Sequence, residues 1–349
     1  MKRKGIALLA AATVTLLTAA AAGARHEVTV LNGAGSTFVS PLVSTWTPAL
    51  GTAFDYTVQY SAVGSGGGIQ AITNRTVDFG ASDAPLTSDQ FTACNGCVQI
   101  PWALAGTAIP YNVPGITPAS AAAHVKLSGD VIAKIYMGTI TNWNDPAIKK
   151  LNPTATFPDL KITPVYRTGN SGTTYNFTDY LASVNPNWSA SIGRGQSVAW
   201  PTGTGASGSA GVAGVVQNTP GAICYVDTAF ALANKLHFAA IENAAGKFIY
   251  PSIVNIKAAG GAITSVPAGN ELHIVNPPKS NPTAYPIATY TYIILPTKSS
   301  NAAALRKMVF WALTTGQQGK YTAKLWFAPI PKIVLVASEK TLKVVQSNT

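Results

Sequence analysis

The 349-residue chain carries 24 Lys and Arg against 13 Asp and Glu, a formal net charge of +11, and is 47% apolar. A chain of this length and apolar content buries a sizeable core, which excludes a largely disordered protein. The positive charge comes from scarce acids and not from basic runs, so we expect no nucleic-acid partner and a mild attraction for anions.

Residues 1–24 predict a cleaved secretory signal peptide. Residues 2–4 form a basic start, residues 6–17 are apolar, and residues 22–24 have the A-x-A pattern of a cleavage site. The apolar stretch is too short for a membrane span, and the cleavage site has no neighbouring cysteine for a lipid anchor. We therefore expect an exported protein that is periplasmic or secreted.

Strands and helices are predicted to alternate along the rest of the chain. Ser128 is expected to cap a helix that reaches Tyr136, and Asp145-Pro146 to start another. Alternation of this kind indicates an α/β protein with mostly parallel sheets. The strand-like runs are 28–31, 56–60, 77–83, 162–166, 221–226 and 290–295, and a helical pattern covers 302–314.

Three glycine-rich turns each precede a helical pattern and carry a hydroxyl group. They are residues 33–38, 64–68 and 169–173, and Arg167 precedes the third, where Ser171 is a good N-cap. A helix start offers free N–H donors and a partial positive charge, and a guanidinium adds a planar fork for an oxyanion. Together the three turns and Arg167 predict one anion site. By contrast, residues 203–209 predict a flexible loop.

The cysteines predict a disulfide and not a metal centre. Cys94 and Cys97 form a C-x-x-C pair, which in an oxidising compartment favours a small disulfide loop. With no second pair and four scattered histidines, we expect no zinc and no cofactor. Cys224 lies in an apolar run and is expected to be buried.

With these motifs in place, the chain resembles the periplasmic phosphate-binding proteins of Pst-type ABC importers. The resemblance follows nearly the whole mature chain in order, through residues 33–38, 64–68, 77–86, 135–140 with Trp143, 167–173, 220–226, 285–287 and 328–331. It implies a two-lobed type II periplasmic binding protein with two hinge crossings, near Tyr111 and Pro282. One lobe would comprise residues 25–110 and 282–349, and the other residues 111–281.

The resemblance also implies a ligand shell and partners. The implied ligand is inorganic phosphate, the implied partner is the membrane-embedded permease of an ABC importer, and the implied state is a monomer without enzymatic activity. One lobe would contribute the earlier shell residues and the other the later ones, so that closure completes the site. The shell residues are Thr37, Phe38, Ser65, Asp83, Arg167, Ser171, Gly172 and Thr173.

Asp83 is the residue that favours phosphate over sulfate. An ionised carboxylate accepts a hydrogen bond from the proton that phosphate retains at neutral pH, whereas sulfate leaves the same carboxylate unpaired and repelled. A cap of the helix after Pro85 is the structural alternative for Asp83. One departure from the family pattern is Gly169, where relatives often carry an acid that orients the Arg.

Two other functions fit parts of the sequence. The fold class also includes binders of sulfate, molybdate or organic anions, and extracellular sensors or surface proteins. A trypsin-like hydrolase is the enzymatic alternative, with His124, Asp130 or Asp145, and Ser171 in the required order. The interval between them is too short for two β-barrels, so we expect no enzyme.

Overall fold

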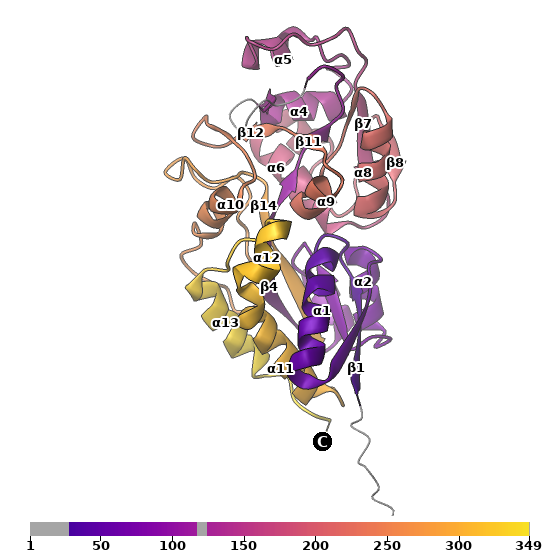
Figure 1. The fold of residues 1–349 in the computed structure, drawn as a ribbon, viewed down its shortest axis with the longest axis vertical. Coiled ribbons are helices and arrows are strands. Elements are labelled where there is room, and N and C mark those ends of the chain that lie inside the picture. The colour runs from indigo at the N-terminus through magenta and orange to yellow at the C-terminus, as the bar shows by residue number, and fades with distance from the viewer. Residues whose placement is uncertain (1–27, 117–123, 349) are drawn as a thin grey trace, which may run out of the picture.

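The computed structural model describes residues 28–116 and 124–348; the predicted signal peptide, residues 1–24, lies outside the described residues. The chain forms two α/β lobes that are stacked along the long axis of the molecule (Figure 1). The predicted two-lobed α/β class is confirmed. Among the described helices, none has the length and apolar character that crossing a membrane requires.

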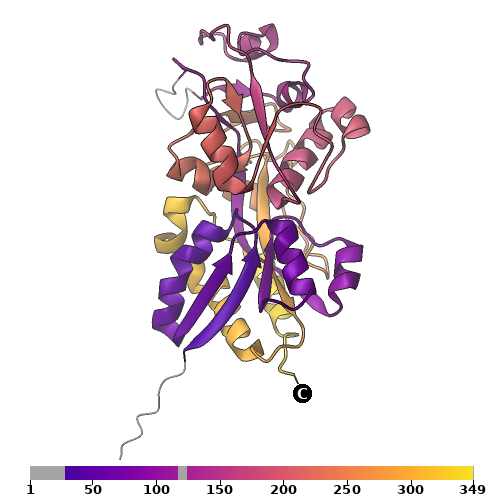
Figure 2. The same ribbon diagram turned by 90° about the vertical axis from the view of Figure 1, so that its right-hand side faces the viewer.

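The first lobe is built on a six-stranded sheet of order β10-β4-β14-β3-β1-β2. Strands of this sheet are visible in the lower half of Figure 2. β1 pairs in parallel with β2 and β3, and β14 joins them antiparallel, between β3 and β4. Parallel neighbours arise where a helix returns the chain to the same edge. The strands are β1 (Thr29–Gly35), β2 (Tyr56–Ser61), β3 (Phe79–Ser82), β4 (Cys97–Ala108), β10 (Val226–Asp227) and β14 (Ala288–Pro296).

Helices cover this sheet and supply most of its aromatic core. Trp46 packs edge-on against Trp102 and Trp311, and Phe79 packs against Trp102. These side chains are all buried. The helices are α1 (Ser40–Phe54), α2 (Ser65–Thr73), α3 (Ser88–Cys94), α11 (Ala302–Leu313), α12 (Gly319–Thr322) and α13 (Lys332–Leu342), with short turns η2 (Thr315–Gln317) and η3 (Ala323–Leu325).

The second lobe has a five-stranded sheet, β11-β5-β9-β7-β8, and a small sheet, β13-β12-β6. β7 is parallel to both β8 and β9, and β5 is antiparallel to β9. The strands are β5 (Pro110–Tyr111), β6 (Lys126–Leu127), β7 (Thr163–Arg167), β8 (Thr204–Ala206), β9 (Ala222–Ile223), β11 (His237–Phe238), β12 (Ala240–Glu242) and β13 (Phe248–Ile249). The helices are α4 (Gly129–Tyr136), α5 (Pro146–Leu151), α6 (Gly172–Val184), α7 (Pro186–Ser191), α8 (Gly208–Asn218), α9 (Thr228–Ala233) and α10 (Ile253–Gly260).

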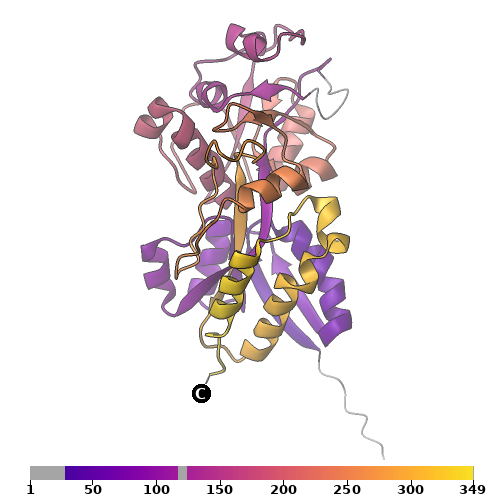
Figure 3. The same cartoon turned by 90° about the vertical axis from the view of Figure 1, so that its left-hand side faces the viewer.

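The two sheets are connected where β4 leads into β5 and where the chain enters β14. The strands β4 and β14 run along the long axis of the molecule toward the second lobe (Figure 3). The N–H of Thr107 donates to the C=O of Ile287 at 2.8 Å, so the two connections lie side by side. Such paired segments are the usual place for a hinge.

The helix starts predicted from capping residues are present, and one helix begins later than expected. Ser128, Asp145 and Ser171 each accept a hydrogen bond from a backbone N–H of the helix that they precede. The first glycine-rich turn, residues 33–38, was expected to lead directly into a helix, whereas the helix begins at Ser40. The reason is that the Ser36 hydroxyl accepts from the N–H groups of Phe38 and Val39 and holds a turn before the helix.

The cysteine predictions hold. Cys94 and Cys97 form a disulfide between α3 and β4, and Cys224 is a free, buried thiol. The guanidinium of Arg75 donates to the C=O groups of Ile72, Cys94 and Asn95. The disulfide loop is thereby tied to the end of α2, the helix whose first residue is Ser65.

Candidate functional site

The turn after β1 presents one hydroxyl to each side of the site. The Ser36 hydroxyl donates to Asp83 Oδ1 at 2.5 Å, and the Thr37 hydroxyl lies 3.2 Å from Arg167 Nη1. The Phe38 ring packs against Phe327 in the core, so this residue offers only its backbone to a ligand. The turn therefore contacts both charged residues predicted for the site.

Asp83 follows β3 and lies beside the start of α2. The Ser65 hydroxyl is 3.4 Å from Asp83 Oδ2 and accepts from the Asp83 N–H at 3.2 Å. Gly64 precedes Ser65 with a φ of 88°, a left-handed conformation that glycine adopts without strain. The cap of α3 is Thr87, so the alternative role of Asp83 as a helix cap is not what the structure has. Asp83 is 2% exposed and belongs to the cluster.

Arg167 ends β7 in the other lobe and is only 5% exposed. Its Nη1 donates to the hydroxyls of Thr37 at 3.2 Å and Ser209 at 3.5 Å. Its backbone N–H donates to the hydroxyl of Tyr225 at 3.0 Å. Among the described residues, its Nε has no hydrogen-bond partner. A buried guanidinium with free donor capacity is suited to bind an anion.

The start of α6 completes the cluster. The Ser171 hydroxyl caps the helix by accepting from the Thr174 N–H, and the buried Thr173 hydroxyl has no partner among the described residues. Gly172 approaches the first lobe so closely that a β-carbon there would lie 2.6 Å from Ser65 Oγ and 2.8 Å from Asp83 Cβ. Only glycine permits this contact between the two lobes.

The structure thus brings all eight predicted site residues together. Further contacts hold the lobes around them: the Gly66 N–H donates to the Asn170 C=O at 3.0 Å, and the Asn176 side chain to the Asp83 C=O at 2.9 Å. The eight predicted residues supply one guanidinium, one carboxylate, several hydroxyls and the first N–H groups of α2 and α6. This set offers many donors and a single ionisable acceptor, which suits an oxyanion that carries a proton.

Burial controls the protonation of the charged groups. It raises the pKa of Asp83 to about 6, although the Ser36 hydrogen bond, the Arg167 charge and the Ser65 hydrogen bond each lower it. Burial likewise lowers the pKa of Arg167, against the effects of Tyr225, Asp83 and Asp227. At neutral pH both groups remain ionised.

Comparisons with known proteins agree with this fold. Residues 19–313 match the PBP superfamily domain. The chain is 38% identical over 305 residues to the phosphate-binding protein PstS of Xylella fastidiosa (strain Temecula1), covering 86% of this chain and 81% of that protein. It is 37% identical over 315 residues to PstS of Pasteurella multocida (strain Pm70), covering 88% of each. The chain belongs to the PstS family.

A solved relative supports the fold of this PstS family member. The phosphate-binding protein from Stenotrophomonas maltophilia superposes with a TM-score of 0.67 at 22% identity, covering 89% of this chain and 93% of that chain. The similarity covers most of the chain, including both lobes.

Sequence reasoning missed three residues of the cluster. Ser36 lies in the first glycine-rich turn and was assigned no role from the sequence, although its hydroxyl donates to Asp83. Ser209 fell in the stretch expected to be a flexible loop; instead residues 203–209 contain β8 and the start of α8. Pairing of β8 with β7 overrides the glycine-rich composition. Asp227 caps α9 and is fully buried near Arg167. Its sequence signal was an Asp, a favoured N-cap residue, directly after an apolar strand.

The hydrolase alternative finds no support in the placement of its residues. His124 stacks on Tyr250 at a ring distance of 4.0 Å, and its Nδ1 lies 3.0 Å from the Phe238 C=O. Ser171 uses its hydroxyl as the cap of α6. Within the described ranges, no group of three or more His, Cys, Asp or Glu side chains is arranged to hold a metal ion.

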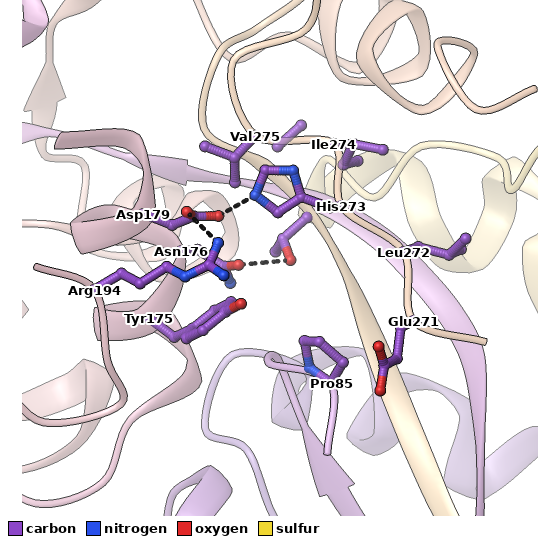
Figure 4. A pocket seen from close by; sticks show the side chains of 12 residues that line it. Pro85, Tyr175, Asn176, Asp179, Arg194, Glu271, Leu272, His273, Ile274 and Val275 are labelled. Atoms are coloured by element: carbon purple, nitrogen blue, oxygen red, sulfur yellow. Dashed lines mark hydrogen bonds and ion pairs between the residues drawn. The ribbon is translucent and has the colours of Figure 1, made fainter. Parts of the chain in front are cut away.

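A polar pocket of about 260 Å³ adjoins the cluster, between α6 and residues 271–275. In Figure 4, His273 and Arg194 both point at Asp179, and Asn176 lies beside them. Burial raises the pKa of Asp179, but the hydrogen bonds and charges of His273 and Arg194 outweigh it and lower the pKa. His273 and Arg194 are therefore already engaged with the Asp179 carboxylate, whereas Arg167 Nε has no hydrogen-bond partner among the described residues.

Proposed function

We propose that this protein binds inorganic phosphate outside the cytoplasmic membrane and delivers it to the permease of an ABC importer. The observation that carries the proposal is a buried carboxylate, Asp83, placed among hydroxyl and N–H donors that also surround a buried guanidinium, Arg167. The relatives named phosphate-binding protein PstS support the same ligand. The proposed ligand shell is the eight residues described above.

Asp83 accounts for the choice of ligand. Phosphate donates its proton to an ionised Asp83, while its other oxygens accept from Arg167, the hydroxyls and the helix starts. Sulfate has no proton for this carboxylate, so the buried charge would stay unpaired beside a second negative charge. Selectivity thus follows from one acceptor in a cradle of donors.

The site supports binding without chemistry. Three of its serine hydroxyls already have hydrogen-bond partners: Ser36 and Ser65 face Asp83, and Ser171 caps α6. A nucleophile requires an adjacent base that can take its proton. The oxygens of the Asp83 carboxylate are instead occupied as hydrogen-bond acceptors in the cluster. We infer that the protein releases phosphate unchanged and works as a monomeric, exported carrier.

Calorimetry with the purified mature chain, freed of anions, tests the proposal. We expect one phosphate per chain and little or no sulfate binding. Asp83→Asn should admit sulfate, because an amide donates where a carboxylate cannot, while Asp145→Asn, at the cap of α5 far from the cluster, should leave selectivity unchanged. Equal affinity of the unaltered protein for both anions would contradict the assigned role of Asp83.

A further inference from the structure

A fourth helix start, that of α8, reaches the site. Ser209, its second residue, is fully buried. Its N–H donates to Thr37 Oγ1 at 3.3 Å, and its hydroxyl lies 2.8 Å from the same oxygen and 3.5 Å from Arg167 Nη1. Ser209 therefore contacts one proposed ligand residue from each lobe.

Behind Ser209 lies a second buried carboxylate, that of Asp227. Its Oδ1 accepts from the Phe230 N–H at 2.9 Å, which caps α9. Its Oδ2 has no partner at hydrogen-bond distance among the described residues, and the side chain is 0% exposed. A cap needs only one oxygen, which Asn or Ser supplies equally well. The cost of burying a full charge therefore calls for a further role.

The groups around Asp227 connect it to the site. Its charge interacts with Arg167 and Asp83, the hydroxyl of Ser209 lowers its pKa, and Cys224 is the neighbouring thiol. Burial is the largest effect and raises the pKa of Asp227 to about 7, above that of Asp83. With both carboxylates and Arg167 ionised, the cluster is already net negative before an anion arrives.

A bound phosphate makes that imbalance worse. It brings one or two negative charges into a space where Asp83 must stay ionised to accept the phosphate proton. Charges of one sign that share a buried site cannot all remain ionised, so one group takes up a proton. Asp227 is the carboxylate with no ligand contact to lose.

We propose, on the basis of the proposed phosphate-binding function, that Asp227 is a positioning residue of the site that takes up a proton from solvent when phosphate binds. In its ionised form its negative charge acts electrostatically on the buried guanidinium of Arg167. Its protonated form carries no charge, so the cluster has one negative charge fewer. The positive charge of Arg167 then attracts the ligand without competition from Asp227.

Calorimetric titration with inorganic phosphate in buffers of different ionisation enthalpy tests this step, because it counts protons exchanged on binding. We expect net proton uptake by the unaltered protein above about pH 7. Asp227→Asn retains the cap oxygen but cannot protonate, so it should take up fewer protons and show a flatter fall of affinity with rising pH. Asp145→Asn, the same change at the cap of α5, is the matched control.

Ser209→Ala supplies a second measure. Losing its hydrogen bonds to Thr37 and Arg167 should weaken phosphate binding by about tenfold. Proton uptake equal to that of the unaltered protein in Asp227→Asn would make Asp227 a helix cap only, and an unaltered protein that binds phosphate without proton uptake would also overturn the inference. An unaltered protein that fails to bind phosphate would instead overturn the proposed function, and this step with it.

Discussion

Asp83 is buried with only hydroxyl groups and one guanidinium to stabilise its charge. The Ser36 and Ser65 hydroxyls face its two oxygens, and Arg167 acts on it electrostatically. These groups do not recover the cost of removing a carboxylate from water, so its pKa stays raised. At the scale of single residues, the site is therefore a source of instability in the protein without ligand.

This instability predicts the pH dependence of folding. The pKa of Asp83 rises from 3.8 to about 6 on folding, so the folded state holds this proton more tightly than the unfolded chain. The ionisation of Asp83 then costs no stability below about pH 4, and its cost grows as the pH rises to about 6 and remains above that. Asp83→Asn should raise the free energy of unfolding by on the order of 2 kcal/mol above this window.

Denaturant unfolding of both proteins in phosphate-free buffer measures that difference. The variant must be compared with the parent because other carboxyl groups also contribute to the pH dependence. Folding raises the pKa of Asp227, as it does that of Asp83, and lowers the pKa of Asp179. Below about pH 4 the two proteins should have similar stability. A variant that is less stable than the parent at neutral pH would show that the carboxylate stabilises the fold.

Arg167 is predicted to be the main source of binding energy. Arg167→Ala should weaken phosphate binding by about 2–5 kcal/mol, the usual cost of removing one member of a buried charged pair. Arg167→Lys should recover only part, because an ammonium group cannot reproduce the planar fork. Calorimetry gives both values, with Arg306→Lys in α11 as the control, since the Arg306 guanidinium donates to the Val345 C=O and is not part of the cluster. Full affinity in Arg167→Ala would place the guanidinium outside the site.

At the scale of elements, the site is a meeting of helix starts from both lobes. The turn before α1 and the start of α2 come from one lobe, and the starts of α6 and α8 from the other. Each presents N–H groups at its positive end. The approach between α6 and α2 depends on Gly172, because a side chain there would overlap Ser65 and Asp83.

Gly172→Ala should therefore impair binding without disturbing either lobe. The added methyl group meets Ser65 Oγ and Asp83 in the present arrangement, and overpacking of this kind costs about 1–3 kcal/mol. We expect phosphate affinity to fall by that amount in calorimetry, while the folding of each lobe is retained. Gly214→Ala is the matched control, because a β-carbon at Gly214 in α8 meets no atom within 4 Å. Unchanged affinity in Gly172→Ala would mean that this contact is absent in the bound protein.

At the scale of the molecule, the cluster lies where the two lobes meet. Thr37, Ser65 and Asp83 precede β5, whereas Arg167 and the start of α6 follow it. Hydrogen bonds between the two groups, such as Thr37 with Ser209 and Asn176 with Asp83, form only when the lobes are together. A ligand held by both groups binds the closed form in preference to an open one.

Phosphate should therefore close the molecule. Hinge rotation at the paired segments near Thr107 and Ile287 would bring the lobes together around the ligand. We expect small-angle scattering to give a smaller radius of gyration with saturating phosphate than without it. Arg167→Ala should lose this compaction at the same phosphate concentration. An unchanged profile in the unaltered protein would indicate a rigid binder and remove the support for an open–closed delivery cycle.

The sequence by itself determined the features that depend on near neighbours in the chain. The cap at Ser171, the glycine-rich start at Ser65 and the placement of Asp83 after a strand were all predicted and are present. Capping joins residues about three positions apart, so its signal is contained in a short stretch of sequence. The resemblance to phosphate-binding proteins extended these local signals to a common site.

Only the tertiary structure decided which distant groups share the site and how they are protonated. Thr37 and Ser209 are 172 positions apart, and Asp227 meets Arg167 through packing of strands and helices that no local pattern describes. Their raised or lowered pKa values arise from burial, which depends on what the rest of the chain places around them. Helix starts depend on neighbouring residues and can therefore be predicted from the sequence. The charge balance of this site depends on groups that only the folded chain brings together.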